Sequence, residues 1–102
     1  MIFGGERFPI NSIKKILKYL NRTNIFNVSG PTECTCICSA HKVTKKEILN
    51  LKNIPVGKIN SYFGYKLFTE NEEENHKGEL YLEGPAVSKG YYNNKKATNK
   101  NF

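Results

Sequence analysis

Hydrophobic and polar positions follow two different periods along this chain, and each period predicts a different kind of element. Residues 1–3 and 25–28 are short apolar runs that indicate buried strands. Between them, apolar residues recur every three or four positions and predict a helix with one apolar face, capped by Asn11 or Ser12. This order of strand, helix and strand, with short links, is typical of a parallel α/β unit.

The rest of the chain favours strands. Three stretches have the alternation or the composition of strands: 34–39, 62–69 and 78–84. Thr44 is placed to cap a short helical or irregular piece over 45–51. Pro55 excludes a central strand over 54–58, which is therefore predicted as a loop or an edge segment.

Three polar or mixed segments complete the assignment. Residues 70–77 are acidic and polar, and predict an exposed turn. Residues 87–92 are predicted as a short strand or turn, and 93–102 as a helix start or a loose end. The whole pattern predicts an α/β fold, in which a strand–helix–strand end of a parallel layer (1–52) precedes the β-rich strands of a small barrel-like subdomain (53–102).

These two segments are expected to form a fragment of one larger domain. Chain termini normally lie at the surface, whereas residues 1–3 read as a core strand, so further residues are expected upstream. No apolar run is long enough to span a membrane, and no segment reads as a secretory signal. We therefore expect a soluble, cytoplasmic protein with no membrane partner.

The charge balance adds a second hypothesis. A net charge of +7 over 102 residues suits a phosphate or nucleic-acid ligand. The lysines are scattered in pairs, however, and form no arginine-rich block, so a solvated surface is favoured over a nucleic-acid patch. Nucleic acid is thus the less favoured partner.

The cysteines indicate reduced thiols. Cys34, Cys36 and Cys38 are odd in number, which argues against a disulfide framework. Alternation along a strand places Cys36 on the opposite face from the other two, so one zinc ion could not easily gather all three, even with His41 nearby.

A Gly-Pro turn after the second apolar run is the strongest candidate for chemistry. Gly30 permits close approach to the main chain, and Pro31 stiffens the turn. Thr32 then offers a hydroxyl donor and Glu33 a hard anionic oxygen. A bound triphosphate with its magnesium ion needs this combination, although Gly-Pro pairs also punctuate ordinary surface turns.

Several blocks around this turn occur together in one known family. Phe-Gly-Gly-Glu at 3–6 resembles a Gly-Gly-Glu loop, and 27–33 is similar to an Asn-x-Tyr-Gly-Pro-Thr-Glu motif. Residues 54–58 resemble Ile-Pro-Ile-Gly-Lys, and 78–93 resemble a Gly-Glu-Leu block followed by Val-x-x-Gly-Tyr. The chain thus resembles the adenylate-forming enzymes, in particular the amino-acid adenylation domains of nonribosomal peptide synthetases and the D-alanine–carrier protein ligases.

The resemblance implies a reaction. The carboxylate of an amino acid attacks the α-phosphate of ATP, pyrophosphate leaves, and the acyl group passes from the adenylate to a carrier-protein thiol. ATP and Mg²⁺ are the implied cofactors, and the amino acid and the carrier protein the implied partners. Two anions must meet, so catalysis depends on positioning and on charge stabilisation.

The same resemblance implies roles for single residues. Asn27 contacts the adenine amine, the Gly5–Glu6 backbone lines the adenine, and Thr32 and Glu33 are catalytic, Thr32 on the α-phosphate and Glu33 on magnesium. The implied nucleotide-binding set is Gly5, Glu6, Asn27, Ser29, Gly30 and Thr32. The implied acyl pocket is Ile2, Gly4, Val28, Cys36 and Ile37, whose apolar character favours a small or uncharged amino-acid side chain.

Two departures from the family pattern limit these expectations. Ser29 stands where the family has a tyrosine, and a hydroxyl supplies no surface for stacking on adenine. The chain also lacks the family's ribose-binding aspartate motif, its upstream phosphate loop and its catalytic lysine, so the 102 residues alone are expected to be inactive. The alternatives are a small basic phosphate- or nucleic-acid-binding module and a degenerate relative without catalysis.

Overall fold

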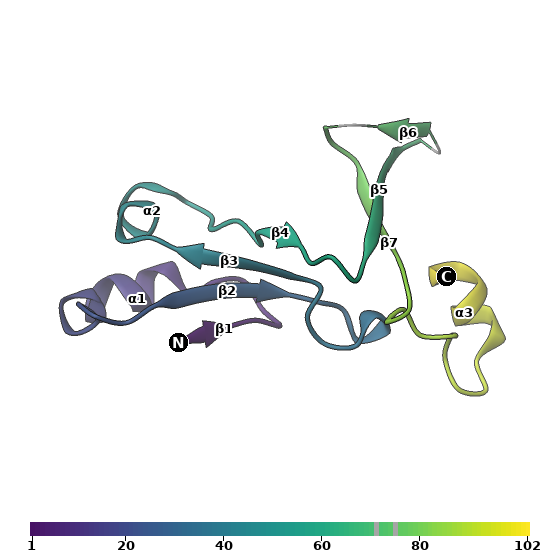
Figure 1. Ribbon diagram of the computed structural model, residues 1–102, viewed down its shortest axis with the longest axis horizontal. Helices are drawn as coiled ribbons and strands as arrows, with labels where there is room; N and C mark the ends of the chain where they lie inside the picture. The colour runs from purple at the N-terminus through teal and green to yellow at the C-terminus, as the bar shows by residue number, and fades with distance from the viewer. Residues whose placement is uncertain (71, 75) are drawn as a thin grey trace.

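The structure, a computed structural model, describes residues 1–70, 72–74 and 76–102 and has a mixed α/β fold with two sheets (Figure 1). The first sheet has the strand order β1-β2-β3-β4 and the second β6-β5-β7. The first contains β1 (Ile2–Phe3), β2 (Ile25–Ser29), β3 (Ser39–Val43) and β4 (Lys58–Ile59). The second contains β5 (Gly64–Thr69), β6 (Glu72–Glu74) and β7 (Glu79–Glu83).

Helices occur at the three places where the sequence pattern predicts or allows a helical segment. They are α1 (Ile10–Ile16), continued by a 3₁₀ turn (Leu17–Tyr19), α2 (Lys45–Asn50) and α3 (Lys95–Asn101). The expected cap of α1 is wrong, because the helix already begins at Ile10, with Pro9 as its N-cap residue, and Asn11 and Ser12 lie inside its first turn. Residues 87–92 form no strand; they are bends and irregular chain between turns at 85–86 and 92–93.

The predicted parallel layer is confirmed only for its first pair of strands. β1 and β2 run parallel and are joined through α1, whereas β3 is antiparallel to both β2 and β4. Parallel neighbours need a crossover of a dozen or more residues. Residues 30–38 are too few for one, so β3 turns back beside β2.

The strand predicted over 34–39 is wrong. Thr32–Cys34 form a 3₁₀ helix, and Thr35 and Cys36 have positive φ values of 51° and 78°, so the chain cannot extend before Ser39. Cys34 and Cys38 are buried and Cys36 is exposed, but local turn geometry rather than strand alternation places them so.

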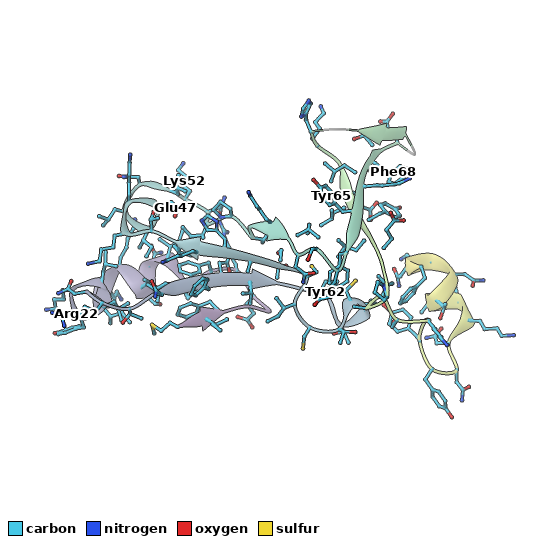
Figure 2. The ribbon with its side chains drawn as sticks, viewed as in Figure 1. Arg22, Glu47, Lys52, Tyr62, Tyr65 and Phe68 are labelled. Atoms are coloured by element: carbon cyan, nitrogen blue, oxygen red, sulfur yellow. The ribbon has the colours of Figure 1, made fainter. Side chains whose placement is uncertain are left out.

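The second sheet is open, which corrects the expectation of a barrel-like arrangement within the described residues. β5 is its central strand and pairs antiparallel with β6 and β7, and three strands cannot close on themselves. Residues 72–74 were predicted as part of an exposed turn and instead form β6, while 71 and 75 lie outside the described residues. This sheet projects away from the first, and Tyr65 and Phe68 of β5 are marked in Figure 2.

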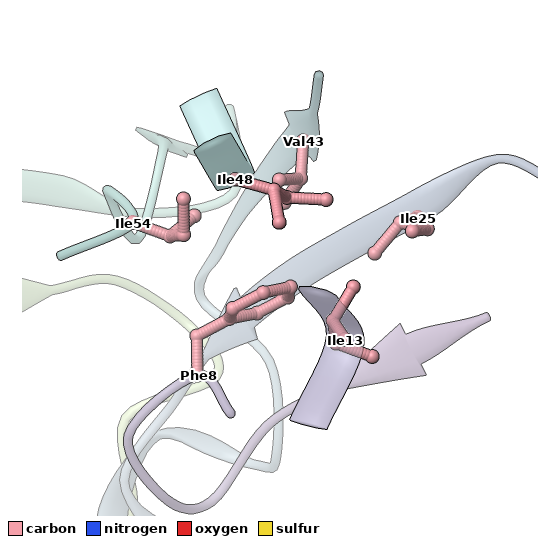
Figure 3. Packing of buried hydrophobic residues seen from close by; sticks show 6 residues of the cluster. All are labelled: Phe8, Ile13, Ile25, Val43, Ile48 and Ile54. Atoms are coloured by element: carbon pink, nitrogen blue, oxygen red, sulfur yellow. The ribbon is translucent and has the colours of Figure 1, made fainter. Parts of the chain in front are cut away.

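The main core lies on one face of the first sheet. A buried cluster joins α1 and α2 to that face: Phe8, Ile13, Ile25, Val43, Ile48 and Ile54 (Figure 3). The strand alternation puts Ile2, Phe26 and Val28 on the opposite face, which no helix covers within the described residues. Ile2 is therefore 69% exposed, so the strand predicted over residues 1–3 is confirmed as β1 but its expected burial is wrong except at Phe3, which packs against the main cluster.

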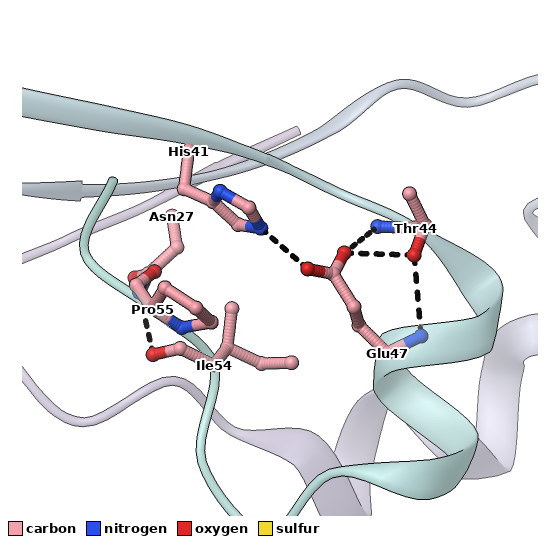
Figure 4. Close-up of polar contacts among 6 residues, drawn as sticks. All are labelled: Asn27, His41, Thr44, Glu47, Ile54 and Pro55. Atoms are coloured by element: carbon pink, nitrogen blue, oxygen red, sulfur yellow. Dashed lines mark hydrogen bonds and ion pairs between the residues drawn. The ribbon is translucent and has the colours of Figure 1, made fainter. Parts of the chain in front are cut away.

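Polar contacts fasten α2 and the segment after it to this covered face (Figure 4). Thr44 and Glu47 form a capping box at the start of α2, and His41 Nε2 lies 2.8 Å from Glu47 Oε1. Hydrogen bonds from the Thr44 backbone and hydroxyl lower the pKa of Glu47 to about 2. In addition, the Ser39 hydroxyl donates to the carbonyl of Val56 (2.9 Å), which holds the segment that leads into β4.

The fold is elongated. Its radius of gyration is 16.3 Å, against about 13 Å for a compact domain of this length. No helix in the described part of the chain has the length and apolar character that crossing a bilayer requires.

Candidate functional site

An open groove lies where β1 and β2 end. Because these two strands are parallel, the loops at their carboxyl ends meet at one edge of the sheet, which is where α/β sheets commonly bind ligands. The groove has a volume of about 550 Å³. It is lined by Gly5, Glu6, Arg7, Phe8, Asn27, Val28, Ser29, Gly30, Pro31, Asn53, Ile54 and Val56.

The Gly-Pro turn takes its shape from a close backbone contact. A Cβ atom on Gly30 would lie 1.9 Å from the carbonyl oxygen of Cys36, so only glycine fits. Pro31 is extended (φ −69°, ψ 157°) and starts the 3₁₀ helix that carries Thr32 and Glu33. The close approach to the main chain that was expected at Gly30 thus occurs, and it packs the turn against the loop that follows it.

Asn27 is a buried polar residue at the wall of the groove, with 4% of its surface exposed. Its Nδ2 donates to the carbonyl of Pro55 at 2.8 Å and lies 3.5 Å from that of Ile54 (Figure 4). These bonds fix the amide, whose Oδ1 accepts no hydrogen bond from the described residues. A single oriented acceptor of this kind can bind an amino group in the groove.

Glu33 is held from two sides by the segment that follows β7. The hydroxyl of Tyr91 donates to Oε1 of Glu33, and the backbone N–H of Ser88 donates to the Glu33 carbonyl at 2.7 Å. Beside them, the Thr35 hydroxyl donates to the carbonyl of Ala86 at 2.8 Å. The second sheet is thereby joined to the turn that follows β2.

The contact with Tyr91 also sets the charge on Glu33. The hydrogen bond from the Tyr91 hydroxyl, followed by a backbone hydrogen bond, lowers the pKa of the Glu33 carboxyl, and the same contact raises the pKa of Tyr91. Glu33 is therefore ionised at neutral pH and donates no proton, and the hydrogen bond from Tyr91 occupies only its Oε1. An ionised carboxylate oxygen is a ligand that Mg²⁺ prefers.

The structure brings most of the predicted nucleotide-binding residues together. Five of them line the groove: Gly5, Glu6, Asn27, Ser29 and Gly30. Thr32 and Glu33 lie just past its edge at Pro31, where Thr32 is exposed. Glu33 lines a neighbouring groove of about 600 Å³, which also contains Pro31 and Tyr91.

The predicted acyl-pocket residues are less closely grouped. Gly4 lies against Val28, since a Cβ on Gly4 would be 2.6 Å from Val28 Cγ2. Ile37 is 46% exposed on the loop before β3, and Ile2 and Cys36 are exposed as well. Val28 lines the main groove and Gly4 lines a second one beside it, and the acyl pocket stays a prediction.

Three residues of these grooves were missed by sequence reasoning. Arg7 and Asn53 line the main groove, and Arg7 donates to the side-chain oxygen of Asn53. Tyr91, which belongs to the Val-x-x-Gly-Tyr block, was given no role in the site, but it contacts Glu33. Arg7 directly follows the Gly-Gly-Glu block and Asn53 directly precedes the Ile-Pro block, so proximity to both motifs was the available signal.

Other clusters of ligating side chains are sparse. No group of three or more His, Cys, Asp or Glu side chains within the described ranges could hold a metal ion. Burial, and after it the charges of Cys38 and Glu33, raises the pKa of the Cys34 thiol, which therefore stays protonated in the core. Glu33 thus remains the metal-binding candidate through its own carboxylate.

Comparison with known proteins gives consistent matches along the chain. Residues 1–92 match the family model described as "AMP-binding enzyme". The chain is 35% identical over 105 residues to a D-alanine–D-alanyl carrier protein ligase of Streptococcus pneumoniae, covering 98% of this chain and 20% of that relative. It therefore spans about a fifth of the length of the curated relatives it matches.

Solved structures share the fold. A nonribosomal peptide synthetase protein with adenylation and carrier domains, holo-PA1221, superposes with a TM-score of 0.85 at 26% identity, over 97% of this chain and 18% of that one. An o-succinylbenzoate coenzyme A synthetase of Bacillus subtilis, solved with ATP and a magnesium ion, superposes with a TM-score of 0.72 at 21% identity, over 99% of this chain and 21% of that one. At that identity the second likeness shows the fold alone.

Proposed function

This chain belongs to the family of AMP-binding enzymes, and from that membership we propose that it is part of an ATP-dependent ligase that activates an amino acid as its acyl-adenylate. The observation that carries the proposal is the groove at the ends of β1 and β2, which gathers five of the residues expected to bind a nucleotide. The activity is proposed for the full-length protein, because the matched relatives are about five times longer.

In this proposal the groove binds the adenine. Oδ1 of Asn27 accepts a hydrogen bond from the adenine amine, an orientation supported by the bond from Nδ2 to Pro55. The Gly5–Glu6 backbone and Gly30 line the base. Arg7, the cation of the groove, offers a planar guanidinium near Ser29, where the family's aromatic ring is missing.

The end of the turn serves the phosphates. The exposed hydroxyl of Thr32 donates to the α-phosphate, and the Glu33 carboxylate binds a magnesium ion. Magnesium, when bound, screens the negative charge that opposes attack by a carboxylate. The Tyr91 bond, which occupies only Oε1, and the lowered pKa of Glu33 support this assignment.

The substrate proposal follows from the acyl pocket and the named relative. Ile2, Gly4, Val28, Cys36 and Ile37 carry no charge, which favours a small or uncharged amino-acid side chain. The ligase of Streptococcus pneumoniae acts, by its name, on D-alanine and a D-alanyl carrier protein. We extend this to an amino acid and a carrier-protein thiol for the full-length protein.

The remaining parts of such an enzyme would complete both sheets. The uncovered face of the first sheet carries Ile2, Phe26 and Val28, an exposed apolar set of the kind that a further part of a larger protein covers. Further strands would close the second sheet into the barrel-like subdomain. The division into 1–52 and 53–102 stays a prediction, and β4 of the first sheet lies beyond residue 52.

Amino-acid-dependent exchange of pyrophosphate into ATP tests the proposal on the full-length gene product. We expect exchange with one small amino acid, and a loss of about a hundredfold or more in Glu33→Ala, comparable to removal of a catalytic electrostatic group. Glu83→Ala, on the exposed β7, is the matched control and should keep the activity. Full activity in Glu33→Ala would contradict the assigned role.

Ser29 favours one competing function, that of a non-catalytic relative. Such a protein would bind neither magnesium-ATP nor an RNA oligonucleotide in a salt-sensitive way, and would show no exchange. RNA binding without exchange would instead support the basic-module hypothesis. Titrating both ligands against the full-length gene product separates the three functions.

A further inference from the structure

We propose that Tyr91 is a positioning residue for the magnesium ligand Glu33, and that it acts by holding one carboxylate oxygen so that the other is presented to the metal. This inference rests on the proposed function. It assigns a role to a residue of the segment after β7, to which sequence reasoning gave none.

The contact itself joins two segments that lie far apart in the sequence. The Tyr91 hydroxyl donates to Oε1 of Glu33 across 58 positions. The bond occupies Oε1 and does not involve Oε2. A carboxylate on a short 3₁₀ helix otherwise rotates freely about its side-chain bonds, and fixing one oxygen removes most of that freedom before a metal arrives.

Tyr91 is itself anchored, which a positioning role requires. Its backbone N–H donates to Oγ1 of Thr98 at 3.0 Å, and its ring packs edge-on against Phe102, with ring centres 5.6 Å apart. Thr98 lies in α3 and accepts from Tyr91 while its own hydroxyl donates to the Asn94 carbonyl at 3.0 Å. The side chain of Tyr91 is thus held by α3, which is the only helix after β7 among the described residues.

The backbone of Glu33 is fixed by the same segment. Ser88 N–H donates to the Glu33 carbonyl at 2.7 Å, so main chain and side chain are both held from one loop. Hydrogen bonds from protein groups orient metal ligands in this way in many sites, and their loss typically weakens metal binding by about 10- to 100-fold. Glu33 and Tyr91 both lie at the surface here, so we expect a smaller effect.

Tyr92 provides a matched control. It is the next residue, has the same side chain and is 94% exposed, with no interaction to any described residue. Tyr92→Phe removes the same hydroxyl as Tyr91→Phe without touching Glu33. The comparison therefore separates the contact from the chemistry of a lost phenol.

The experiment compares full-length wild type, Tyr91→Phe and Tyr92→Phe by two readouts. One is the Mg²⁺ concentration that gives half-maximal pyrophosphate exchange, and the other is the affinity for Mn²⁺ by electron paramagnetic resonance with a non-hydrolysable ATP analogue. We expect Tyr91→Phe to weaken both by roughly fivefold, with the KM for the amino acid unchanged. Tyr92→Phe should match wild type.

A third variant guards against a purely structural effect. In a Glu33→Gln background, Tyr91→Phe should add little further loss, because the two residues act as one unit. An unchanged or tighter metal constant in Tyr91→Phe, or fully additive losses, overturns the positioning role. Absence of amino-acid-dependent exchange in the wild type overturns the proposed function instead, so the two failures are distinguishable.

Discussion

The two sheets of this protein are stabilised to very different degrees. The first is covered on one face by α1 and α2 and holds the main buried cluster, in which Ile48 is 0% exposed. The second has no helix on either face within the described residues, and Leu80 and Tyr81 of β7 are 43% and 52% exposed. Its buried contacts concentrate at the junction, where Phe63 packs with Cys34 and Cys38.

This difference explains where a site can form. The groove needs walls that do not move, and the first sheet supplies them through its core and the bonds of Asn27 and Ser39 to the 54–56 segment. The second sheet contributes by reaching back to the turn through Ser88 and Tyr91. The first region thus supplies the walls of the groove, and the second holds the Glu33 side chain beside it.

The largest effect that tests this comparison is expected from core truncation. Ile48→Ala removes a fully buried side chain and should lower the free energy of unfolding by about 3 kcal/mol. Leu80→Ala in the second sheet should cost below about 1 kcal/mol, because its side chain is already partly in water. Urea denaturation of both variants measures the difference, and equal losses would show that the second sheet has a core of its own.

A smaller effect is expected from two glycine substitutions. In Gly30→Ala the new Cβ meets the backbone of Cys36, which cannot move aside, and we expect a loss of about 2 kcal/mol, as for overpacking, and a displaced Thr32–Cys34 turn. In Gly64→Ala of β5 the Cβ meets the Glu83 side chain at 2.8 Å, which can rotate away. Thermal denaturation should therefore place Gly64→Ala within about 0.5 kcal/mol of wild type.

The next effect concerns nucleotide binding in the first region. Arg7→Ala removes the cation of the groove and should raise the KM for ATP by about fivefold, which corresponds to one exposed charge contact. Arg22 lies at the far end of the first region in Figure 2, so Arg22→Ala is the matched control. It should leave the KM for ATP unchanged. Equal effects of the two substitutions would indicate general attraction by the basic surface rather than a site.

The smallest effect is a local one at acidic pH. Glu47 has its pKa lowered to about 2 from 4.5, so its contribution to α2 is present above about pH 4.5 and is lost as the pH falls toward 2. Hydrogen exchange of the α2 amides should accelerate over that range beyond the intrinsic pH effect. Glu47→Gln should remove this acid-dependent step, and its persistence would assign the step to another carboxyl.

Local pattern was enough to predict much of the first region. The helix over Ile10–Ile16, the strand at 25–29 and the capping box at Thr44 all follow from interactions within a few residues. Five groove residues, Gly5, Glu6, Asn27, Ser29 and Gly30, were also predictable because they stand within motifs, whereas Arg7 and Asn53 were missed. Register and direction were not predictable, since the antiparallel return of β3 depends on the length of the 30–38 connection.

The contacts between distant segments lay beyond sequence reasoning. Nothing in the residues around Tyr91 shows that its hydroxyl reaches Glu33, 58 positions away. The same holds for Asn27, whose Nδ2 is oriented by the Pro55 carbonyl. Each of these bonds forms only after packing elsewhere has brought two distant segments together. The residues next to each side chain in the sequence therefore give no signal of the bond.

The sequence by itself determined the family, the strand–helix–strand unit and the identity of the groups that could bind a nucleotide, because these depend on residue type and on short-range periodicity. Only the tertiary structure decided which of those groups share a groove, which partners hold Asn27 Nδ2 and Glu33 Oε1, and which face of the first sheet is bare. The physical reason is that side-chain chemistry is a local property, whereas its orientation is fixed by hydrogen bonds and packing between segments that meet only after folding.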